Sequence, residues 1–422
     1  MRAEHEGQTV AHSLVKAYAS LRRAVEVGLA DTVDFLQRLV RVPSVLGAEQ
    51  GAQDLVEDRL RALGFAVRSL ELDAGQLAER PESGIPLASY RNRRCLVGTL
   101  AGGGGRTLLL NGHVDVVSEE PADLWTRPPF GAVIEGGRLY GRGACDMKGG
   151  IAAMLLAVEA ALAAGPLPGG IVYQSVIEEE CGGNGTLTTC ISGPSADGVV
   201  IAEPTNGGID LVAVGVIWAR ITIEGRPRHA SATDEGSHPI ETAVVVIEAL
   251  RGLEEELNAE PEPEFAGVER PYLLNVGALH AGDWPSTTPG RAQLDVRLGL
   301  PIRLDPAAGQ EQLAAAVRAA APDARVEFRG FRARGYAFEE TPLVDLLCRC
   351  HEEVHGLRPR PEPSRATTDL RFFAPPLGPG QAVCYGPTGG GLHGVDEWVD
   401  LASIADVATV LALLLRRWGE PG

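Results

Sequence analysis

The stretch TLLLNGHVDVV, residues 107–117, begins as a short, continuously apolar run and ends in polar residues. A strongly helical segment at 147–165 follows it, and three other apolar runs share its character: CLVGTL (95–100), IVYQSVI (171–177) and GVVIA (198–202). Short apolar strands that alternate with helices are typical of α/β sheets covered on both faces. The sequence therefore predicts an α/β fold built on a buried sheet.

A second pattern occupies the middle of the chain, from about Val214 onward. It reads strand, helix, strand, strand, helix, strand, at 214–225, 238–258, 271–282, 291–300, 307–321 and 324–330. This β-α-β-β-α-β order is that of a ferredoxin-like domain. The α/β pattern then resumes, with helices near 342–355 and 400–417. We therefore expect a domain at 214–331, inserted whole between the two parts of the first fold, 1–213 and 332–422.

The N-terminal region predicts a helix but no export signal. Residues 31–43, DTVDFLQRLVRVP, place apolar side chains at helical spacing, with Asp31 as the N-cap and Pro43 as the stop. The residues before them mix charges and lack the apolar core and the cleavage site of a signal peptide. Seven cysteines without regular spacing fit reduced thiols. We therefore expect a cytoplasmic protein.

The composition excludes two classes of partner. The chain has 422 residues, with 56 acidic against 38 basic side chains and a formal charge of −18. No cluster of lysine and arginine is interleaved with aromatic residues, so a nucleic-acid-binding surface is not expected. The longest apolar stretches are short or interrupted, for example at Glu159, so none predicts a membrane span. The sequence thus predicts neither a nucleic-acid partner nor a membrane partner.

Polar side chains of the kind that bind metals follow three of the apolar runs. His113 and Asp115 follow the first, the run Glu178–Glu180 follows the second, and Glu203 follows the third. In open α/β sheets, ligands bind beyond the carboxyl ends of the strands, so we expect these side chains at one rim of the sheet. The sequence therefore predicts a metal-type site at that rim.

Five segments together resemble the signature blocks of a family of dinuclear zinc hydrolases that includes acetylornithine deacetylase, succinyl-diaminopimelate desuccinylase and glutamate carboxypeptidase. They are NGHVDVV, LYGRGACDMKGG, IEEECGGNGT, AEPT and GLHGVDEWV, and they follow the family's order from His113 to Trp398. The resemblance implies a zinc-dependent amidohydrolase with a zinc-peptidase-like mixed sheet flanked by helices. It also implies that the two outer parts of the chain form the catalytic domain and that the inserted ferredoxin-like domain serves for dimerisation.

The resemblance implies five metal ligands. Asp146 would bridge two zinc ions. His113 and Glu203 would complete the first site, and Glu180 and His393 would complete the second. A bridging carboxylate offsets the repulsion between cations that lie roughly 3.5–4 Å apart in two-metal sites. The implied cofactor is therefore two Zn²⁺ per chain, with Co²⁺ or Mn²⁺ as substitutes.

The same resemblance implies roles beside these ligands. Glu179 would be the general base that takes a proton from the attacking water. Asp115 would orient the imidazole of His113 through its other ring nitrogen. The family also often has a cis peptide after the bridging aspartate, which here is the bond between Asp146 and Met147.

The inserted domain is expected to complete the active site. Asn275 and Arg297 match positions that contact the substrate's carboxylate or the reacting carbonyl in relatives, and a guanidinium can donate two parallel hydrogen bonds to a carboxylate. His229 matches a histidine that reaches the partner subunit's metals, which implies a homodimer. Gly391 is one of the glycines beside His393 that allow substrate to approach the backbone closely. A structural ion pair for Arg297 and a purely local role for His229 are the alternatives.

The stretch HEEVH, His351–His355, offers a competing metal site. On a helix its two imidazoles would lie on one face, where they could hold zinc while the glutamate activates a water. A longer zincin motif would continue with a glycine and a third histidine at fixed spacing, and HEEVHGLRPRP lacks that histidine. The sequence leaves open a third ligand further along the chain. Because five ordered blocks outweigh one short match, we expect no metal role for His351 and His355.

The sequence leaves the substrate open. Acetyl, formyl and succinyl groups on an N-acylated amino acid or a related amine all fit, and we expect residues 81–94 and 363–371 to line the entrance to the site. A carboxypeptidase or dipeptidase of the same family is one alternative, and a homologue that binds metal without catalysis is another. Cys145 and Cys181 flank ligands but match no family ligand, so we expect them to be small buried residues.

Overall fold

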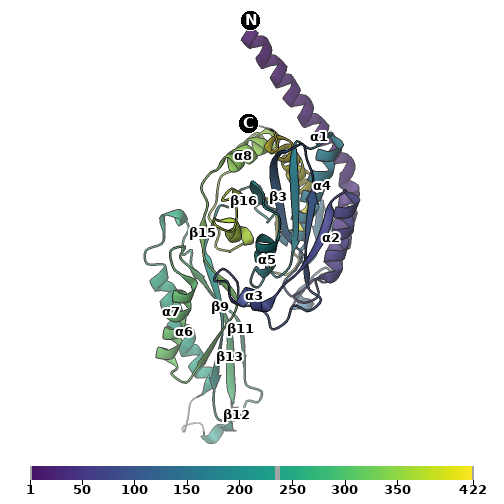
Figure 1. The fold of residues 1–422 in the computed structure, drawn as a ribbon. Coiled ribbons are helices and arrows are strands. Elements are labelled where there is room, and N and C mark those ends of the chain that lie inside the picture. The colour runs from purple at the N-terminus through teal and green to yellow at the C-terminus, as the bar shows by residue number, and fades with distance from the viewer. Residues whose placement is uncertain (1, 233–237, 421–422) are drawn as a thin grey trace.

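The computed structural model describes residues 2–232 and 238–420, with side chains described from residue 18 onward. The chain forms a larger α/β domain and a second, elongated domain that extends away from it, as Figure 1 shows. Both termini belong to the larger domain, and the middle of the chain forms the second one. This arrangement confirms the predicted α/β fold class.

The larger domain is built on a six-stranded mixed sheet. Its strand order is β1 (Ala66–Glu71), β2 (Arg94–Leu100), β6 (Gly169–Val176), β3 (Gly105–His113), β7 (Gly198–Ile201) and β16 (Ala382–Cys384). The last four strands pair in parallel, whereas β2 runs antiparallel to both of its neighbours. The residues of β3, β6 and β7 are mostly buried, as the continuously apolar runs predicted.

Helices cover both faces of this sheet. On one face lie α4 (Gly150–Ala163) and α9 (Leu401–Trp418), beside α1 (Arg2–Val40) and α2 (Gln50–Ala62). On the other lies α5 (Asn184–Ser192), and α8 (Pro342–His355) packs against α9 near β16. Helix α4 is almost completely buried, which explains why its sequence is apolar on every side. Within the described residues, no helix is both long enough and apolar enough to cross a membrane.

Helix α1 differs from the helix that the sequence predicts. It begins at Arg2 rather than at Asp31, so the expected N-cap at Asp31 is wrong. The reason is that apolar residues at helical spacing continue upstream, where Leu21 and Val25 are buried in the core. The helix ends at Val40, shortly before Pro43, as expected. Its first turns project beyond the domain in Figure 1.

The inserted domain has the predicted strand and helix order. Its sheet runs β11 (Leu274–Ala281), β13 (Arg291–Leu300), β9 (Gly215–Glu224) and β14 (Arg325–Ala333), with every pair antiparallel. Helices α6 (Pro239–Leu257) and α7 (Pro306–Ala320) pack against each other and against one face of the sheet. The chain enters and leaves this domain through β8 (Val212–Ala213) and β15 (Tyr336–Ala337), which pair with each other.

The helix-free face of the inserted sheet carries polar and aromatic side chains. Along β9, Ile217, Ala219 and Ile221 are buried in the domain's core, whereas Trp218 and Arg220 point to the opposite face. This alternation separates the apolar core under the helices from a polar and aromatic face on the opposite side of the sheet.

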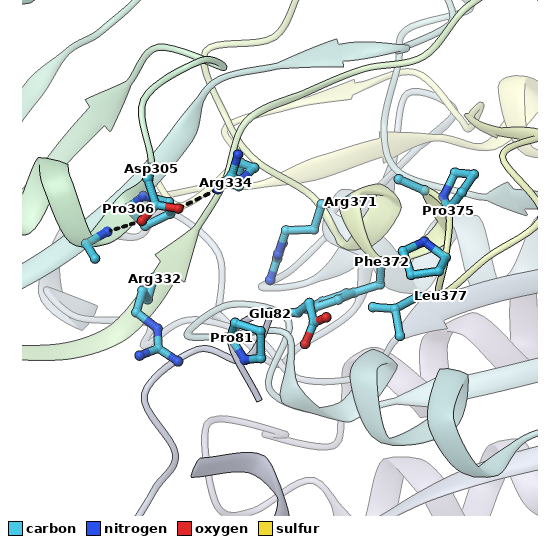
Figure 2. Close-up of a pocket in the computed structure, with 13 residues that line it drawn as sticks. Pro81, Glu82, Asp305, Pro306, Arg332, Arg334, Arg371, Phe372, Pro375 and Leu377 are labelled. Atoms are coloured by element: carbon cyan, nitrogen blue, oxygen red, sulfur yellow. Dashed lines mark hydrogen bonds and ion pairs between the residues drawn. The ribbon is translucent and has the colours of Figure 1, made fainter. Parts of the chain in front are cut away.

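The segment between β1 and β2, residues 73–94, joins the two domains. It includes the short helix α3 (Ala74–Ala78). Arg332 of the inserted domain donates a hydrogen bond to the carbonyl of Ser83 at 3.2 Å, and the Tyr90 hydroxyl donates to Glu178 at 3.0 Å in the larger domain. Figure 2 shows a pocket of about 450 Å³ at this junction, lined from all three parts by Pro81, Glu82, Arg332, Arg334 and Arg371, among others. The segment therefore ties the inserted domain to the α/β domain.

Candidate metal centre and active site

Three neighbouring parallel strands deliver the expected side chains to one rim of the central sheet. Strand β3 ends at His113, and Asp115 lies two residues further on. Glu179 and Glu180 follow β6, and Glu203 follows β7. Because β6, β3 and β7 lie side by side in parallel, these residues leave the sheet at the same edge.

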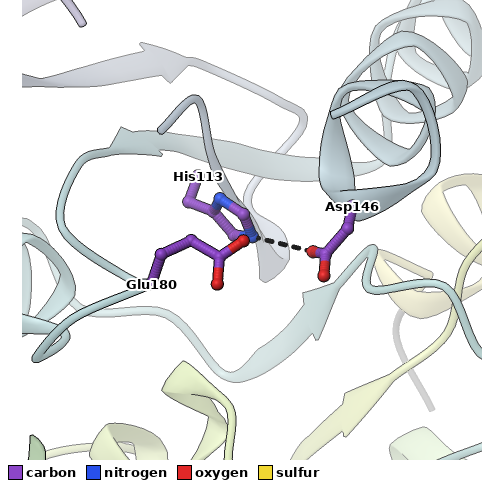
Figure 3. A group of neighbouring side chains, drawn as sticks. All are labelled: His113, Asp146 and Glu180. Atoms are coloured by element: carbon purple, nitrogen blue, oxygen red, sulfur yellow. Dashed lines mark hydrogen bonds and ion pairs between the residues drawn. The ribbon is translucent and has the colours of Figure 1, made fainter. Parts of the chain in front are cut away.

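Asp146 lies between two histidines, with one carboxylate oxygen toward each. Its Oδ1 is 3.2 Å from His113 Nε2 and its Oδ2 is 3.4 Å from His393 Nε2. Glu203 joins the first histidine, with Oε1 3.7 Å from His113 Nε2. Glu180 joins the second, with Oε2 3.0 Å from His393 Nε2. Figure 3 shows His113, Asp146 and Glu180 converging. The side chains thus form two ligand groups that share one carboxylate.

Glu179 lies at the first of these groups. Two sets of three residues each bring one potential donor atom per residue to within 4.8 Å of one another. They are His113, Glu179 and Glu203, and His113, Asp146 and Glu180. Burial raises the pKa of Glu179 well above its usual range, and repulsion from Asp369 adds to this. The carboxyl is therefore held next to the ligand groups in surroundings that favour its taking up a proton.

The charge balance of this cluster fits bound divalent cations. Asp146, Glu179, Glu180 and Glu203 meet there. Within the described part of the chain, the ion-pair partners of Asp146, Glu180 and Glu203 are histidines rather than lysine or arginine. Burial lowers the pKa of His393, but its hydrogen bonds to Asp146 and Glu180 outweigh this and raise the value to about 11. The site thus attracts positive charge strongly, and imidazole with carboxylate is a donor set that suits zinc.

Asp115 contributes differently from the expectation. The imidazole of His113 is held through Nδ1 by the backbone carbonyl of Asp115 at 2.9 Å, whereas the nearer side-chain oxygen is 3.7 Å away. The carboxylate instead accepts hydrogen bonds from the backbone N–H groups of Glu179, at 3.3 Å, and Glu180, at 3.1 Å. With Nδ1 on the carbonyl, Nε2 is left to face the ligand cluster. Asp115 therefore ties the turn after β3 to the turn after β6.

A small sheet brings the last signature segment to the loop that carries Asp146. Its strand order is β17 (Gly389–Gly390), β18 (Trp398–Asp400), β5 (Arg138–Tyr140) and β4 (Val133–Glu135). Strand β5 leads into the loop before Asp146, and β18 follows His393 and Glu397. The peptide bond between Asp146 and Met147 is cis, as the resemblance implied. Two ligands from distant parts of the sequence are thus placed by one piece of β-structure.

Glu397 is a buried residue beside the cluster that the sequence reasoning did not single out. Its side chain is 1% exposed and accepts four hydrogen bonds, from the backbone N–H groups of Gly143 (2.9 Å), Cys145 (2.9 Å) and Asp146 (3.1 Å) and from the Arg142 guanidinium (2.8 Å). Glu397 therefore holds the loop that ends at Asp146, the residue whose carboxylate lies between the two histidines. Its place in the segment GLHGVDEWV, four residues after His393, was the signal that could have found it.

A cavity of about 250 Å³ leads from the ligand cluster toward the inserted domain. Its walls include Glu179, Glu203 and His393 on one side and Trp218, Arg297 and Phe331 on the other. A neighbouring cavity of about 480 Å³ contains Asn275, which lies directly opposite Arg297 across β11 and β13. Arg297 donates to the carbonyl of Arg365 at 2.7 Å, and no described carboxylate pairs with it. Its charge is thus free to meet a substrate anion.

The segments expected at the entrance contribute in part. Thr367 and Thr368 of the 363–371 stretch line the smaller cavity, and Leu87 of the 81–94 stretch lines the larger one. Arg93 instead lies buried in an ion pair with Glu49. That pair anchors the junction segment, and neither of its residues lines the two cavities.

Gly391 lies beside these cavities without lining them. It has a φ of 73°, and a Cβ there would lie 3.0 Å from the Glu397 Cα, so both the conformation and the space favour glycine. The next two residues, Leu392 and His393, line the cavity of about 250 Å³. The structure therefore brings His393, rather than Gly391, to the expected substrate space.

His229 lies away from the ligand cluster of its own chain. It belongs to β10 (Arg228–His229), which pairs with β12 (Thr287–Thr288) at the far tip of the inserted domain in Figure 1. The side chain is exposed, and its Nδ1 is 2.8 Å from the Ser231 hydroxyl. Among the described side chains, it belongs to neither of the groups that could hold a metal ion.

The stretch HEEVH forms the end of α8 and has a packing role. His351 is buried, with Nδ1 2.9 Å from the Tyr385 hydroxyl, and its ring stacks 4.2 Å from that of His355. Burial lowers the pKa of His351 to about 4, which keeps it neutral. Neither histidine belongs to a metal-type group among the described side chains, and neither do the buried Cys145 and Cys181.

Comparison with known proteins agrees with this geometry. The sequence profile of peptidase family M20/M25/M40 matches residues 109–417. The chain belongs to this family. It is 30% identical over 409 residues to succinyl-diaminopimelate desuccinylase of Phenylobacterium zucineum (strain HLK1), covering 92% of this chain and 98% of that one. This M20 protein is accordingly a metal-dependent amidohydrolase.

Solved structures show the same fold at lower identity. The di-peptidase Dug1p of Saccharomyces cerevisiae superposes with a TM-score of 0.81 at 15% identity, covering 96% of this chain and 99% of that one. The YXEP protein of Bacillus subtilis, described as a dinuclear metal binding peptidase from the M20 family, gives a TM-score of 0.60 at 15% identity, covering 92% and 98%. The fold of the M20 protein is therefore shared by enzymes named for different substrates.

The two histidine sites make opposite predictions for metal content. We expect wild-type protein loaded with zinc to hold about two ions per chain. His113→Ala should hold fewer, because it removes a donor from the cluster, whereas His351→Ala and His355→Ala should keep both ions. Metal analysis of the purified, folded variants measures this. Loss of metal from the His351 and His355 variants but not from His113→Ala would place the metal site in α8.

If Glu397 holds the loop of Asp146 in place, substitution of Glu397 should weaken metal binding even though no metal ligand is removed. In Glu397→Gln, an amide group replaces one acceptor oxygen, so two of the loop's donors lose their partner. We expect metal affinity to fall roughly tenfold to a hundredfold, as is typical when a partner of a metal ligand is removed. Titration with zinc in competition with a chelator gives the affinity. Glu255→Gln on the exposed face of α6 is the matched control, and equal affinities in the two variants would contradict a clamp.

Proposed function

We propose that this M20 protein removes a small acyl group from an N-acylated amino acid or a related amine. In the reaction, the amide C–N bond breaks and a C–O bond forms from water, which releases a carboxylic acid and an amine. The observation that carries the proposal is Asp146 between two groups of potential metal ligands, with Glu179 beside them in the wall of a cavity of about 250 Å³. The seven free thiols support the cytoplasmic location predicted from the sequence.

The chain would hold two Zn²⁺, with Co²⁺ or Mn²⁺ as substitutes. His113 and Glu203 would hold one, His393 and Glu180 the other, and Asp146 would bind both. When bound, such ions polarise the amide carbonyl and lower the pKa of water from its bulk value toward about 7. The cluster of buried carboxylates supports this assignment, because it requires compensating positive charge.

Glu179 would supply the base and then the acid. Its carboxylate would take a proton from the attacking water and pass it to the amide nitrogen as the C–N bond breaks. Two features support this role. The backbone N–H of Glu179 is held by Asp115, and its side chain lies within reach of the first ligand group without being needed to complete it.

Arg297 and Asn275 would anchor the substrate from the inserted domain. Arg297 has no carboxylate partner in the described chain, and a guanidinium can bind a substrate carboxylate through two hydrogen bonds. Among acetyl, formyl and succinyl, the succinyl group is favoured by relatives at about 30% identity that are named succinyl-diaminopimelate desuccinylase. Peptide hydrolysis is the alternative, because proteins of the same fold are named dipeptidase and tripeptidase.

A homodimer would complete the site. Strand β11 forms one edge of the inserted sheet and has no further strand partner among the described residues. Ile240, Val244 and Leu279 are exposed apolar side chains on α6 and β11, as expected for a surface that a second copy covers. In such a dimer, the His229 of one chain would donate a hydrogen bond to the developing oxyanion at the other chain's metals.

A substrate panel tests the proposed reaction. Zinc-loaded protein is incubated with acetyl, formyl and succinyl derivatives of the same amino acids and with dipeptides, and the released amine is measured by mass spectrometry. We expect release from the acyl derivatives that stops when a chelator removes the metal. Release from the dipeptides alone would favour the peptidase alternative. No release from any compound by protein that holds both ions would reject the proposal.

Substitutions of Glu179 and Glu180 should have different effects on catalysis and on metal binding. Glu179→Gln should keep both ions and lose turnover by about a hundred- to ten-thousand-fold, the usual contribution of general base catalysis. Glu180→Gln should lose metal as well, because it removes a ligand. Rates are compared at saturating zinc, alongside metal analysis. Equal metal loss in the two variants would mean that their roles are wrongly assigned.

Mixed dimers should reveal the role of His229. His229→Ala and Glu179→Gln should each be nearly inactive, since loss of one oxyanion donor typically costs on the order of a hundredfold. Mixing them should restore activity, because one site in a mixed dimer keeps its own Glu179 and receives an intact His229 from the other chain. Subunit exchange is verified with differently tagged chains. Exchange without recovery would confine His229 to its own subunit or remove it from the mechanism.

A further inference from the structure

The pocket of about 450 Å³ at the junction of the two domains is separate from the active-site cavities. Its lining residues all differ from those of the two cavities beside the ligand cluster. Its walls come from the segment between β1 and β2, from the inserted domain, and from the short helix η5 (Asp369–Phe373) with the residues that follow it. Three stretches far apart in the sequence thus enclose a space of the size that small molecules occupy.

Charged side chains gather at one end of this pocket and apolar ones at the other. Figure 2 shows Asp305, Arg332 and Arg334 on one side, Phe372, Pro375 and Leu377 on the other, and Arg371 and Glu82 between them. A molecule that fits the pocket therefore has a charged end and an apolar end.

The charge of Arg332 is available to a ligand. Arg334 pairs with Asp305, so these two charges offset each other. Arg332 instead donates through Nε and Nη2 to the carbonyl of Ser83 at 3.2 Å, to its hydroxyl at 3.3 Å and to the carbonyl of Arg80 at 3.1 Å. These acceptors are all uncharged, and none of the bonds uses Nη1. An anionic group is the partner that a guanidinium of this kind binds most strongly.

Two buried polar atoms of opposite kind lack partners in the wall of the pocket. The Arg371 side chain is 7% exposed and lies 3.4 Å from the Asp369 carboxylate, and its terminal nitrogens donate to the carbonyls of Thr368 (2.6 Å) and Gly182 (2.9 Å). Its Nε has no acceptor, and Oε2 of Glu82 has no donor. Buried polar atoms are rarely left without partners. The pocket thus lacks both an acceptor and a donor.

One class of small molecule meets all of these features. A free α-amino acid has a carboxylate for Arg332, an ammonium group for Glu82 and a side chain that can pack against Phe372 and Leu377. A simple anion would leave Glu82 without a donor. A neutral apolar molecule would leave Arg332 without an anion as well.

We propose that the junction pocket binds a free α-amino acid with an apolar side chain, whose carboxylate meets Arg332 and whose ammonium group meets Glu82. Such a ligand contacts both domains and the segment between them, so it holds the three together. Arg371 connects this pocket to the active site. It donates to the carbonyl of Gly182, two residues after Glu180, and to that of Thr368, which lines the cavity of about 250 Å³.

Matched ligands test this proposal on the zinc-loaded wild-type protein. L-leucine is compared by calorimetry with 4-methylpentanoate, which lacks only the ammonium group, and with 3-methylbutylamine, which lacks only the carboxylate. Each analogue loses a hydrogen bond to a charged group. We therefore expect its Kd to be on the order of tenfold to a hundredfold higher than that of leucine.

Variants assign the two contacts to single side chains. Glu82→Gln should weaken leucine binding by a similar factor and leave 4-methylpentanoate unchanged, whereas Arg332→Gln should weaken both ligands. Glu79→Gln and Arg325→Gln, at exposed positions nearby, are the matched controls. Arg297→Gln, in the active-site cavities, should keep the affinity for leucine. If the Arg332 variant does not fold, Glu82→Gln still tests the site, because the Oε2 of Glu82 has no hydrogen-bond partner to lose.

Hydrogen exchange locates the bound amino acid. Leucine should slow amide exchange in peptides that cover residues 80–83 and 371–377, on two walls of the pocket. Leucine that binds no more tightly than its two analogues would overturn the proposal, and this result needs no variant to fold. Leucine affinity that is lost in Arg297→Gln but kept in Glu82→Gln would place the amino acid in the active site and overturn it as well. None of these measurements requires hydrolysis, so they do not depend on the proposed function.

Discussion

The mutual repulsion of buried carboxylates at one edge of the central sheet is the constraint on which the rest of the site depends. Asp146, Glu179, Glu180 and Glu203 all meet there, and the ion pairs that Asp146, Glu180 and Glu203 make in the described chain are with histidines rather than lysine or arginine. Such a cluster is unstable unless divalent cations balance it and a rigid frame holds its members apart. The fold supplies the frame, because three parallel strands end at the same edge.

Two further carboxylates hold the loops rather than bind metal. Asp115 accepts from the backbone of the turn with Glu179 and Glu180, and Glu397 accepts from the backbone of the loop with Asp146. Each links a ligand segment to another segment that also carries a ligand. Movement of one ligand therefore strains its neighbours, which keeps the donor atoms in place for metal, as partners of metal ligands commonly do.

The inserted domain supplies one wall of the cavities beside this frame. Its two helices cover one face of its sheet, and the other face carries Trp218 and Arg297 into the cavities beside the ligand cluster. Asp210 approaches the same space from the α/β domain. Family members with this fold are named for different substrates, and a wall shared by two domains can change its polar groups without disturbing the metal ligands.

The sequence by itself determined the fold class, the inserted β-α-β-β-α-β domain and the position of the metal-type side chains at one rim. These features depend on local patterns, namely apolar runs, helical spacing and the residues that follow parallel strands. Only the tertiary structure decided that the Asp115 side chain holds a turn and that Glu397 clamps the loop of Asp146. The reason is physical. The hydrogen bond between Glu397 and Asp146 joins residues 251 positions apart, and contacts over such separations arise from packing that no local pattern encodes.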